Sequence, residues 1–183
     1  MSFFRNIQEY LLASELKKEL ARSARDKKFI SFEKSRNIGI IYKVGEEKDQ
    51  IEFSEFVSRL QNDKKEVKAL GIIKYKDIPH YCYPKLSYDY VTRRNINWMR
   101  KPTGEKVTDF IQKEFDLLIN FDTTHDIALN YIAGFSHAKC KVGLFHENNE
   151  AIYDLMIDTD INCPFKELAE HYLTYINMFS QKA

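Results

Sequence analysis

The sequence predicts a three-layer α/β protein with a Rossmann-like, doubly wound and mostly parallel sheet. Short apolar runs rich in β-branched residues, such as "NIGIIYKV" and "VKALGIIKY", are typical of strands covered on both faces. Amphipathic segments separate these runs, and such alternation indicates a parallel sheet with helices on both sides. A chain of 183 residues fits one domain of this kind with a sizeable core.

A helix is expected over residues 3–28, because apolar side chains recur there at three- to five-residue steps. Its second half is basic, and residues 1–36 contain nine Lys or Arg against five Asp or Glu, a local net charge of +4. We therefore predict an N-terminal basic helical arm, residues 1–35, and a single α/β domain, residues 36–183. Cations also suit a helix C-terminus and the solvent, so this charge has a plain structural interpretation as well.

The first βαβ unit is predicted from strands at residues 36–44 and 67–75. The helix between them, near 51–65, has apolar side chains at i, i+3, i+4 and i+7, and its crossover should be right-handed. Residues 76–104 are long for a loop in a compact domain, and "SYDYVT" within them suits an edge strand.

Helices and strands alternate again in the second half of the chain. Helices are expected over 105–114, 125–135 and 164–180, and strands over 115–121, 138–145 and 151–157. Only "HENNE" separates the last two strands, whereas a parallel crossover needs a dozen residues or more. These two strands should therefore form an antiparallel hairpin at one edge, which would place Asp158 and Asp160 far from Asp122.

A doubly wound sheet usually binds its ligand at the carboxyl ends of its strands. Glu46 follows the first strand here, and Asp122 and His125 follow a later one. These three residues are the weak catalytic candidates of a small transferase-like or metal-dependent enzyme, which would need a deep pocket around them. A structural interpretation competes with this one, because Thr123 and Asp126 fit a capping box at the start of a helix.

Several functions are disfavoured by motif and composition. The loop "KVGEEKDQ" holds one glycine and three carboxylates, and the chain lacks GxGxxG and GxxxxGK[ST], so we expect no nucleotide cofactor. The acidic and His residues have no metal-site spacing, and a net charge of +1 indicates neither nucleic acid nor membrane. The apolar runs are too short for a membrane span, and three cysteines without CxxC spacing favour a cytoplasmic protein.

A non-catalytic interaction module is therefore the favoured function. Residues 80–102 are rich in Tyr, Trp and Arg, which are enriched in binding hot spots, and the basic helix suits an anionic surface. The predicted partner-binding residues are Lys17, Lys18, Arg22, Arg25, Tyr88, Tyr90, Arg93, Arg94, Trp98, Arg100 and Lys101. We expect a protein or ribonucleoprotein partner and a first helix that projects or packs loosely. The alternative is a homodimer through that helix or the edge hairpin.

Several segments together resemble an uncharacterised family of small Bacteroidetes proteins, a domain of unknown function. They are "NIGIIYKV", "VKALGIIKY", "NWMRKP", "EFDLLINF", "IAGFSHAKCKVG" and "YDLMID". The resemblance covers nearly the whole chain and implies fold and lineage rather than mechanism. "FDLLINF…IAGFSHAKCKVG" is also similar to a strand-helix-strand unit of heptosyltransferase-like glycosyltransferases, which need a second Rossmann-like domain, so no catalytic residue is carried over.

Overall fold

The computed structural model describes residues 2–22, 25, 27–83, 85–160 and 162–180, without the side chains of 2–6, 9, 19, 21, 22, 179 and 180. Six parallel strands form one sheet in the order β3-β2-β1-β4-β5-β6. The strands are β1 (Asn37–Lys43), β2 (Glu66–Ile72), β3 (Tyr88–Val91), β4 (Leu117–Asn120), β5 (Cys140–Leu144) and β6 (Leu155–Ile157). The direction of winding reverses between β1 and β4, which confirms the predicted doubly wound sheet.

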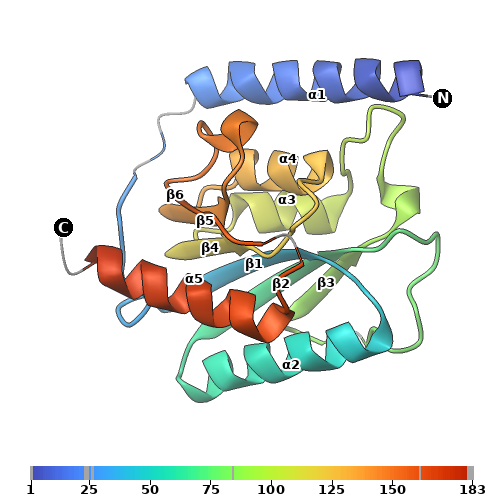
Figure 1. The fold of residues 1–183 in the computed structure, drawn as a ribbon. Coiled ribbons are helices and arrows are strands. Elements are labelled where there is room, and N and C mark those ends of the chain that lie inside the picture. The colour runs from blue at the N-terminus through green and yellow to red at the C-terminus, as the bar shows by residue number, and fades with distance from the viewer. Residues whose placement is uncertain (1, 23–24, 26, 84, 161, 181–183) are drawn as a thin grey trace.

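Helices cover both faces of this sheet (Figure 1). One face carries α2 (Glu47–Asn62) and α5 (Phe165–Ser180), and the other carries α3 (Glu105–Gln112) and α4 (Ile127–Phe135). The N-terminal helix α1 (Ser2–Arg22) lies outside this second helical layer, over α4. Among the described residues, no helix combines the length and the hydropathy needed to cross a membrane.

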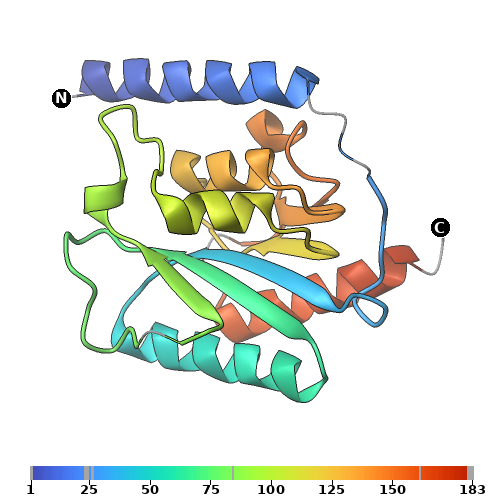
Figure 2. The same cartoon turned by 180° about the vertical axis from the view of Figure 1, so that it is seen from behind.

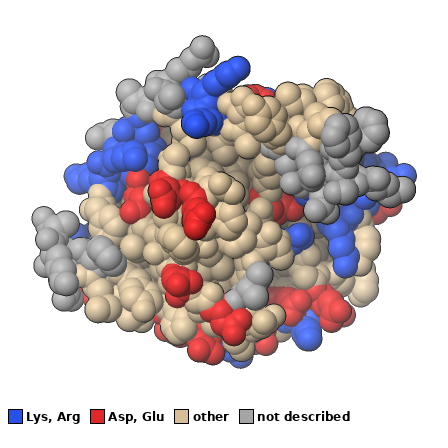
Figure 3. Space-filling view, turned by 45° about the horizontal axis from the view of Figure 1, so that its top comes forward, with Lys and Arg blue, Asp and Glu red and all other residues tan. Residues whose placement is uncertain are grey.

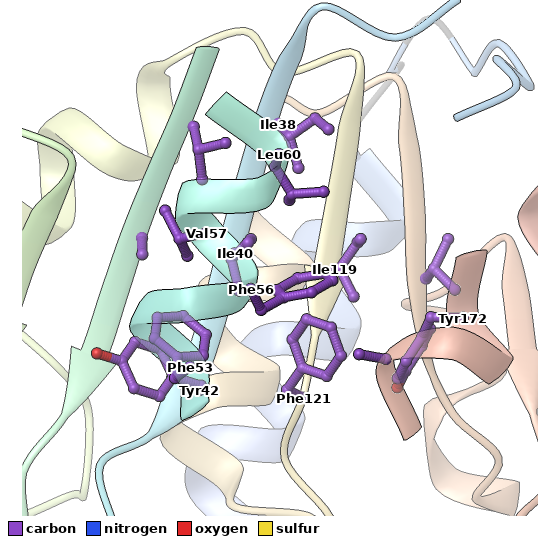
Figure 4. Close-up of a cluster of buried hydrophobic side chains, with 14 of the residues drawn as sticks. Ile38, Ile40, Tyr42, Phe53, Phe56, Val57, Leu60, Ile119, Phe121 and Tyr172 are labelled. Atoms are coloured by element: carbon purple, nitrogen blue, oxygen red, sulfur yellow. The ribbon is translucent and has the colours of Figure 1, made fainter. Parts of the chain in front are cut away.

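The larger part of the core lies between the sheet and the helices α2 and α5. The predicted apolar face of α2 is buried there through Phe53, Phe56, Val57 and Leu60 (Figure 4). The ring of Phe53 stacks on that of Tyr42 with the centroids 3.7 Å apart. Full burial of side chains of this size stabilises a fold by roughly 1.5–3 kcal/mol each, so this layer anchors the strand that carries the first candidate loop.

The last two strands are parallel, so the predicted antiparallel hairpin is wrong. Strand β6 begins only at Leu155, and Val142 of β5 pairs with it in parallel register. Residues 145–154 form a compact crossover, in which Ile152 and Tyr153 pack in the core instead of extending the strand. If these apolar residues are assigned to the strand, the connection is too short for a parallel crossover, which is why the prediction failed. Because β6 is parallel, Asp158 and Asp160 follow it at the same sheet edge as Asp122, contrary to the prediction.

Residues 73–87 connect β2 to the edge strand β3, whose presence in "SYDYVT" is confirmed. They take the place of a helix on the face of the sheet that α2 covers. Cys82 is buried in that core, and Tyr81 packs against it and donates a hydrogen bond from its hydroxyl to the Gly45 carbonyl oxygen at 2.9 Å. Packing therefore accounts for part of the tyrosine content of this segment.

The helix α1 is docked on α4 and does not project, contrary to our expectation. Leu12 and Leu16 are buried in this contact. A Cβ atom added at Gly134 of α4 would lie 2.2 Å from Cδ1 of Leu16, so the two helices approach closely and a larger residue there would displace the Leu16 side chain. The division of the chain at residue 35 stays a prediction, but α1 is an integral layer of the fold.

The segment after α1 also packs on the domain. The backbone N–H of Lys28 donates to the Lys139 carbonyl oxygen at 3.1 Å, so this segment lies beside β5. The ammonium of Lys65 donates to the carbonyl oxygens of Phe32, Glu33 and Ser35, each at 2.8 Å. These contacts fix the path of the chain from α1 to β1.

Candidate functional site

The loop after β1 uses its carboxylates to start α2. Glu46 is the N-cap of α2 and forms a capping box with Asp49, whose side chain accepts a hydrogen bond from the Glu46 N–H at 2.9 Å. A Cβ atom at Gly45 would lie 2.3 Å from the same Asp49 oxygen, so the glycine makes room for the cap. The Glu46 side chain is 83% exposed.

The loop after β4 is organised around the buried carboxylate of Asp122. It accepts hydrogen bonds from the backbone N–H and the hydroxyl of Thr124, at 3.0 and 2.7 Å, and from the N–H of Asp126. Asp126 is the N-cap of α4 and accepts from the Ala128 N–H at 2.9 Å. The predicted capping box is wrong in register, because Asp126 occupies the N-cap position that was assigned to Thr123.

Two cations neutralise the α4 cap. The Lys43 ammonium lies 3.1 Å from the Thr124 hydroxyl and 3.6 Å from an Asp126 oxygen, and the Arg100 guanidinium lies 3.6 Å from that oxygen. Phosphate groups favour helix N-termini with free N–H groups. At the starts of α2 and α4, the chain's own carboxylates already occupy that position.

His125 lies between these groups and pairs with a residue that the sequence did not connect to it. Its backbone is left-handed, with φ of 52°, and its ring centroid is 4.4 Å from that of His146. Burial and the neighbouring His146 lower the pKa of His125, and the nearby Asp122 carboxylate acts in the opposite direction by raising it. Two imidazoles supply half of the ligands of a tetrahedral zinc site, and the described part of the chain has no group of three or more metal-ligating side chains.

The catalytic candidates are thus only partly brought together. Asp122 and His125 share one loop, while within the described residues no hydrogen bond or ion pair joins Glu46 to either of them. A hollow of about 460 Å³ lies elsewhere on the carboxyl edge, next to β3 and the start of α3. Its walls include Asp77 and Arg94, which form an ion pair at 2.7 Å, and it is lined by none of the three candidates.

Both of the predicted partner-binding tyrosines belong to the core. Tyr88 and Tyr90 are buried beneath α2, so neither is on the surface. Burial raises the pKa of Tyr90 to about 12. Arg93 and Arg94 are exposed, although Arg94 is engaged by Asp77. The alternation of aromatic residues in "YDY" is therefore a strand packing pattern.

Residues 96–102, which we name the protrusion, form a closed turn that displays Trp98. Ile96 and Pro102 form an antiparallel bridge, and the side chain of Asn97 accepts hydrogen bonds from the N–H groups of Met99 and Lys101. Trp98 at its tip is 68% exposed. The tryptophan is thus presented by a turn with its own hydrogen bonds.

The protrusion reaches α1 and is fixed to it (Figure 2). The Gln8 side chain donates a hydrogen bond to the Trp98 carbonyl oxygen, and the Lys101 ammonium is 2.7 Å from the Glu15 carboxylate. Lys101 also lies 5.0 Å above the ring of Tyr131 in α4. The fold thereby joins the two segments that were predicted separately to bind a partner.

The outer side of α1 combines exposed apolar and basic side chains. In Figure 3, Lys and Arg side chains gather toward the C-terminal half of α1, beside uncharged ones. We name the following exposed set the α1 surface: Ile7, Tyr10, Leu11, Lys17, Lys18 and Trp98.

Arg25 does not belong to this surface. Its guanidinium is largely buried and donates to both oxygens of Asp154 and to the Ala138 carbonyl oxygen. It therefore holds the segment after α1 against the sheet. The side chain of Arg22, another predicted contact, lies outside the described residues.

These features define a doubly wound α/β protein whose carboxyl edge is occupied by its own helix caps and whose outermost helix carries an exposed mixed surface. The chain belongs to DUF6913, a family of unknown function whose model matches residues 8–179. No curated protein and no solved structure gives a match to it.

Proposed function

We propose that this protein is a non-catalytic interaction module that binds a macromolecular partner through the α1 surface. The observation that carries the proposal is the contact between α1 and the protrusion, made by Gln8 with Trp98 and by Glu15 with Lys101. A preorganised surface loses little conformational entropy on binding, and tryptophan is enriched in binding hot spots.

The charge of this surface favours a protein over a nucleic acid. Two predicted cations, Arg25 and Lys101, are engaged by Asp154 and Glu15 within the molecule. Lys17 and Lys18 are left exposed, next to apolar side chains. Nucleic-acid affinity depends on neutralising many phosphates, whereas an apolar patch with a few cations is common at protein interfaces.

The test uses the tagged 183-residue chain as bait in extract of its native cell, with and without nuclease. Trp98→Ala should lose a protein that the unchanged chain retains, because truncating a hot spot costs roughly 2 kcal/mol or more, about a thirtyfold loss of affinity. Retention after nuclease treatment identifies a protein contact.

Tyr83→Ala is the matched control, since Tyr83 is 66% exposed and lies against α2, on the opposite side of the sheet from α1. This variant should keep the bound protein. An identical bound set for Trp98→Ala and the unchanged chain would exclude the α1 surface as the binding site.

The cellular location and the form of the partner belong to the same proposal. Three free cysteines, two of them buried, support a cytoplasmic module. A homodimer through α1 is one form that the partner could take. A dimer through an edge hairpin is excluded, because β5 and β6 are parallel and form no hairpin.

A small-molecule site in the hollow beside β3 is the second candidate, in place of an enzyme at Asp122. A volume of about 460 Å³ falls within the range of ligand sites, and the hollow lies at the carboxyl ends of parallel strands. Thr103→Trp should fill it. A rise in melting temperature with a phosphorylated or carboxylic metabolite, lost in this variant, would support the site, and no rise across such a panel would dismiss it.

A further inference from the structure

The exposed face of α1 has the periodicity of a helix-packing surface. Its members follow the spacing i, i+3, i+4, i+7, i+10 and i+11, which is the repeat of a seam between packed helices. They are Ile7, Tyr10, Leu11, Ser14, Lys17 and Lys18. Leu12 and Leu16, on the opposite side of α1, already pack on α4. The helix α1 therefore has two packing faces, and among the residues that the structure describes, α4 covers one of them while the members of the other stay largely exposed.

The two ends of this outer face differ in chemistry. Ile7, Tyr10 and Leu11 form an apolar end, on the part of α1 whose Gln8 is hydrogen-bonded to the Trp98 backbone, and Lys17 and Lys18 form a basic end. Within the described residues, neither lysine makes an ion pair. At a rise of 1.5 Å per residue, the face is about 17 Å long, which suits three turns of a partner helix.

From this charge and spacing we infer that the α1 surface binds an acidic amphipathic helix of another protein. This inference rests on the proposed function and specifies its partner. Apolar side chains at i, i+3, i+4 and i+7 of the partner would meet Ile7, Leu11 and Trp98, as in other helix-in-groove complexes. Its carboxylates would meet Lys17 and Lys18, which fixes the orientation of the helix.

The chain contains its own reporter, because Trp98 is the single tryptophan in the sequence. An indole that is exposed in the free protein should shift its emission to the blue when a partner covers it. The probes are an amphipathic Leu/Glu helical peptide and its Leu/Lys counterpart. Oligouridylate, phosphatidylserine vesicles and an increase in protein concentration alone are measured alongside.

The expected result is a saturable blue shift with the Leu/Glu peptide and none with the other probes. In the double variant Lys17→Glu, Lys18→Glu, affinity for the Leu/Glu peptide should fall about tenfold, and the Leu/Lys peptide should bind instead. Both lysines are exposed, so the variant should keep the circular dichroism and melting temperature of the unchanged chain.

Any of three results would overturn the inference. They are no shift with the Leu/Glu peptide, equal binding of both peptides to the unchanged chain and to the double variant, and a shift with RNA, with vesicles or with an increase in protein concentration alone. The proposed function fails separately, because its test is the protein lost from native extract by Trp98→Ala. If Trp98→Ala lost a protein from the extract but the Leu/Glu peptide caused no blue shift, the interaction module would remain supported. The inference that its partner is an acidic helix would be wrong.

Discussion

The carboxyl edge of the sheet and the outer side of α1 use their side chains in opposite ways. At the edge, the carboxylates of Asp49, Asp122 and Asp126 accept hydrogen bonds from the loops and helices that they start. On the α1 surface, Tyr10 of α1 and Trp98 of the protrusion keep most of their surface in solvent, although the Trp98 backbone is hydrogen-bonded to Gln8. Polar residues at the edge of a sheet can thus serve the structure alone, whereas the exposed apolar groups of the α1 surface are the reason for the proposed binding role.

The largest effect that separates the two regions should come from Asp122→Ala. This variant removes the acceptor of three hydrogen bonds in a buried loop and should lower the free energy of unfolding by about 3 kcal/mol. Glu46→Ala, at an exposed cap, should cost about 1 kcal/mol or less. Urea unfolding measures both. If Asp122→Ala were instead stabilising, the loop would be strained for a function and the structural interpretation would fail.

Two adjacent leucines of α1 compare the covered face of that helix with its open face. Leu12→Ala should destabilise the protein by about 3 kcal/mol, because Leu12 is fully buried over α4. Leu11→Ala should change stability by about 0.5 kcal/mol or less. Thermal unfolding followed by circular dichroism distinguishes them. Equal and small effects for the two variants would mean that α1 is not docked in solution.

The pH dependence of stability can show whether water reaches Lys141, a buried lysine in the layer beneath α1. Lys141 donates to the Gly134 carbonyl oxygen at 2.9 Å, and burial, assisted by the charge of Arg25, lowers its pKa to about 7. The unfolded chain holds this proton up to a pKa of about 10.5, so the destabilisation is greatest below pH 7 and fades as pH rises toward 10. Between pH 7 and 9 the protein should gain about 2 kcal/mol of stability from this group.

Lys141→Met is the control for that pH dependence. The variant keeps an unbranched side chain without a charge, so the contribution of this group to the slope of stability against pH should disappear. Urea unfolding at pH 7, 8 and 9 provides the comparison. Parallel slopes for the variant and the unchanged chain would show that water reaches the ammonium.

The last comparison, of two variants that should both have small effects, concerns His125. Its left-handed backbone favours glycine, so His125→Gly should relieve strain while losing the contact with the His146 ring, with a net change of about 1 kcal/mol or less. His125→Ala removes the ring and keeps the strain, and should be the less stable of the two. The reverse order of unfolding midpoints would indicate that the loop is not strained.

Local patterns predicted most of the fold. The buried strands, the apolar face of α2 and the edge strand β3 all follow from periodicity and residue type. The direction of β6 does not follow from them, because the sequence does not reveal that Ile152 and Tyr153 belong to a short crossover and pack in the core. The direction in which two strands pair depends on the three-dimensional packing of such residues, which a pattern of alternating side chains cannot specify.

The candidate sites were predicted less well, for a related reason. Hydrogen bonding decides whether Asp122 is a catalyst or a loop anchor, and burial decides whether Tyr88 and Tyr90 are contacts or core. Neither property follows from residue type. The contact between α1 and the protrusion joins residues about 90 positions apart in the sequence. It could not be predicted, because no sequence pattern marks Gln8 and Glu15 as the polar partners in this contact.

The close fit of Leu16 over Gly134 has a practical consequence for truncation. A shortened chain that starts after residue 22 would leave the side of α4 beneath Leu12 and Leu16 open to water. Such a truncated protein should aggregate or be degraded. If it failed to bind a partner, the cause would be the destabilised fold and not the loss of a binding surface. Point changes on the outer side of the first helix avoid that confusion.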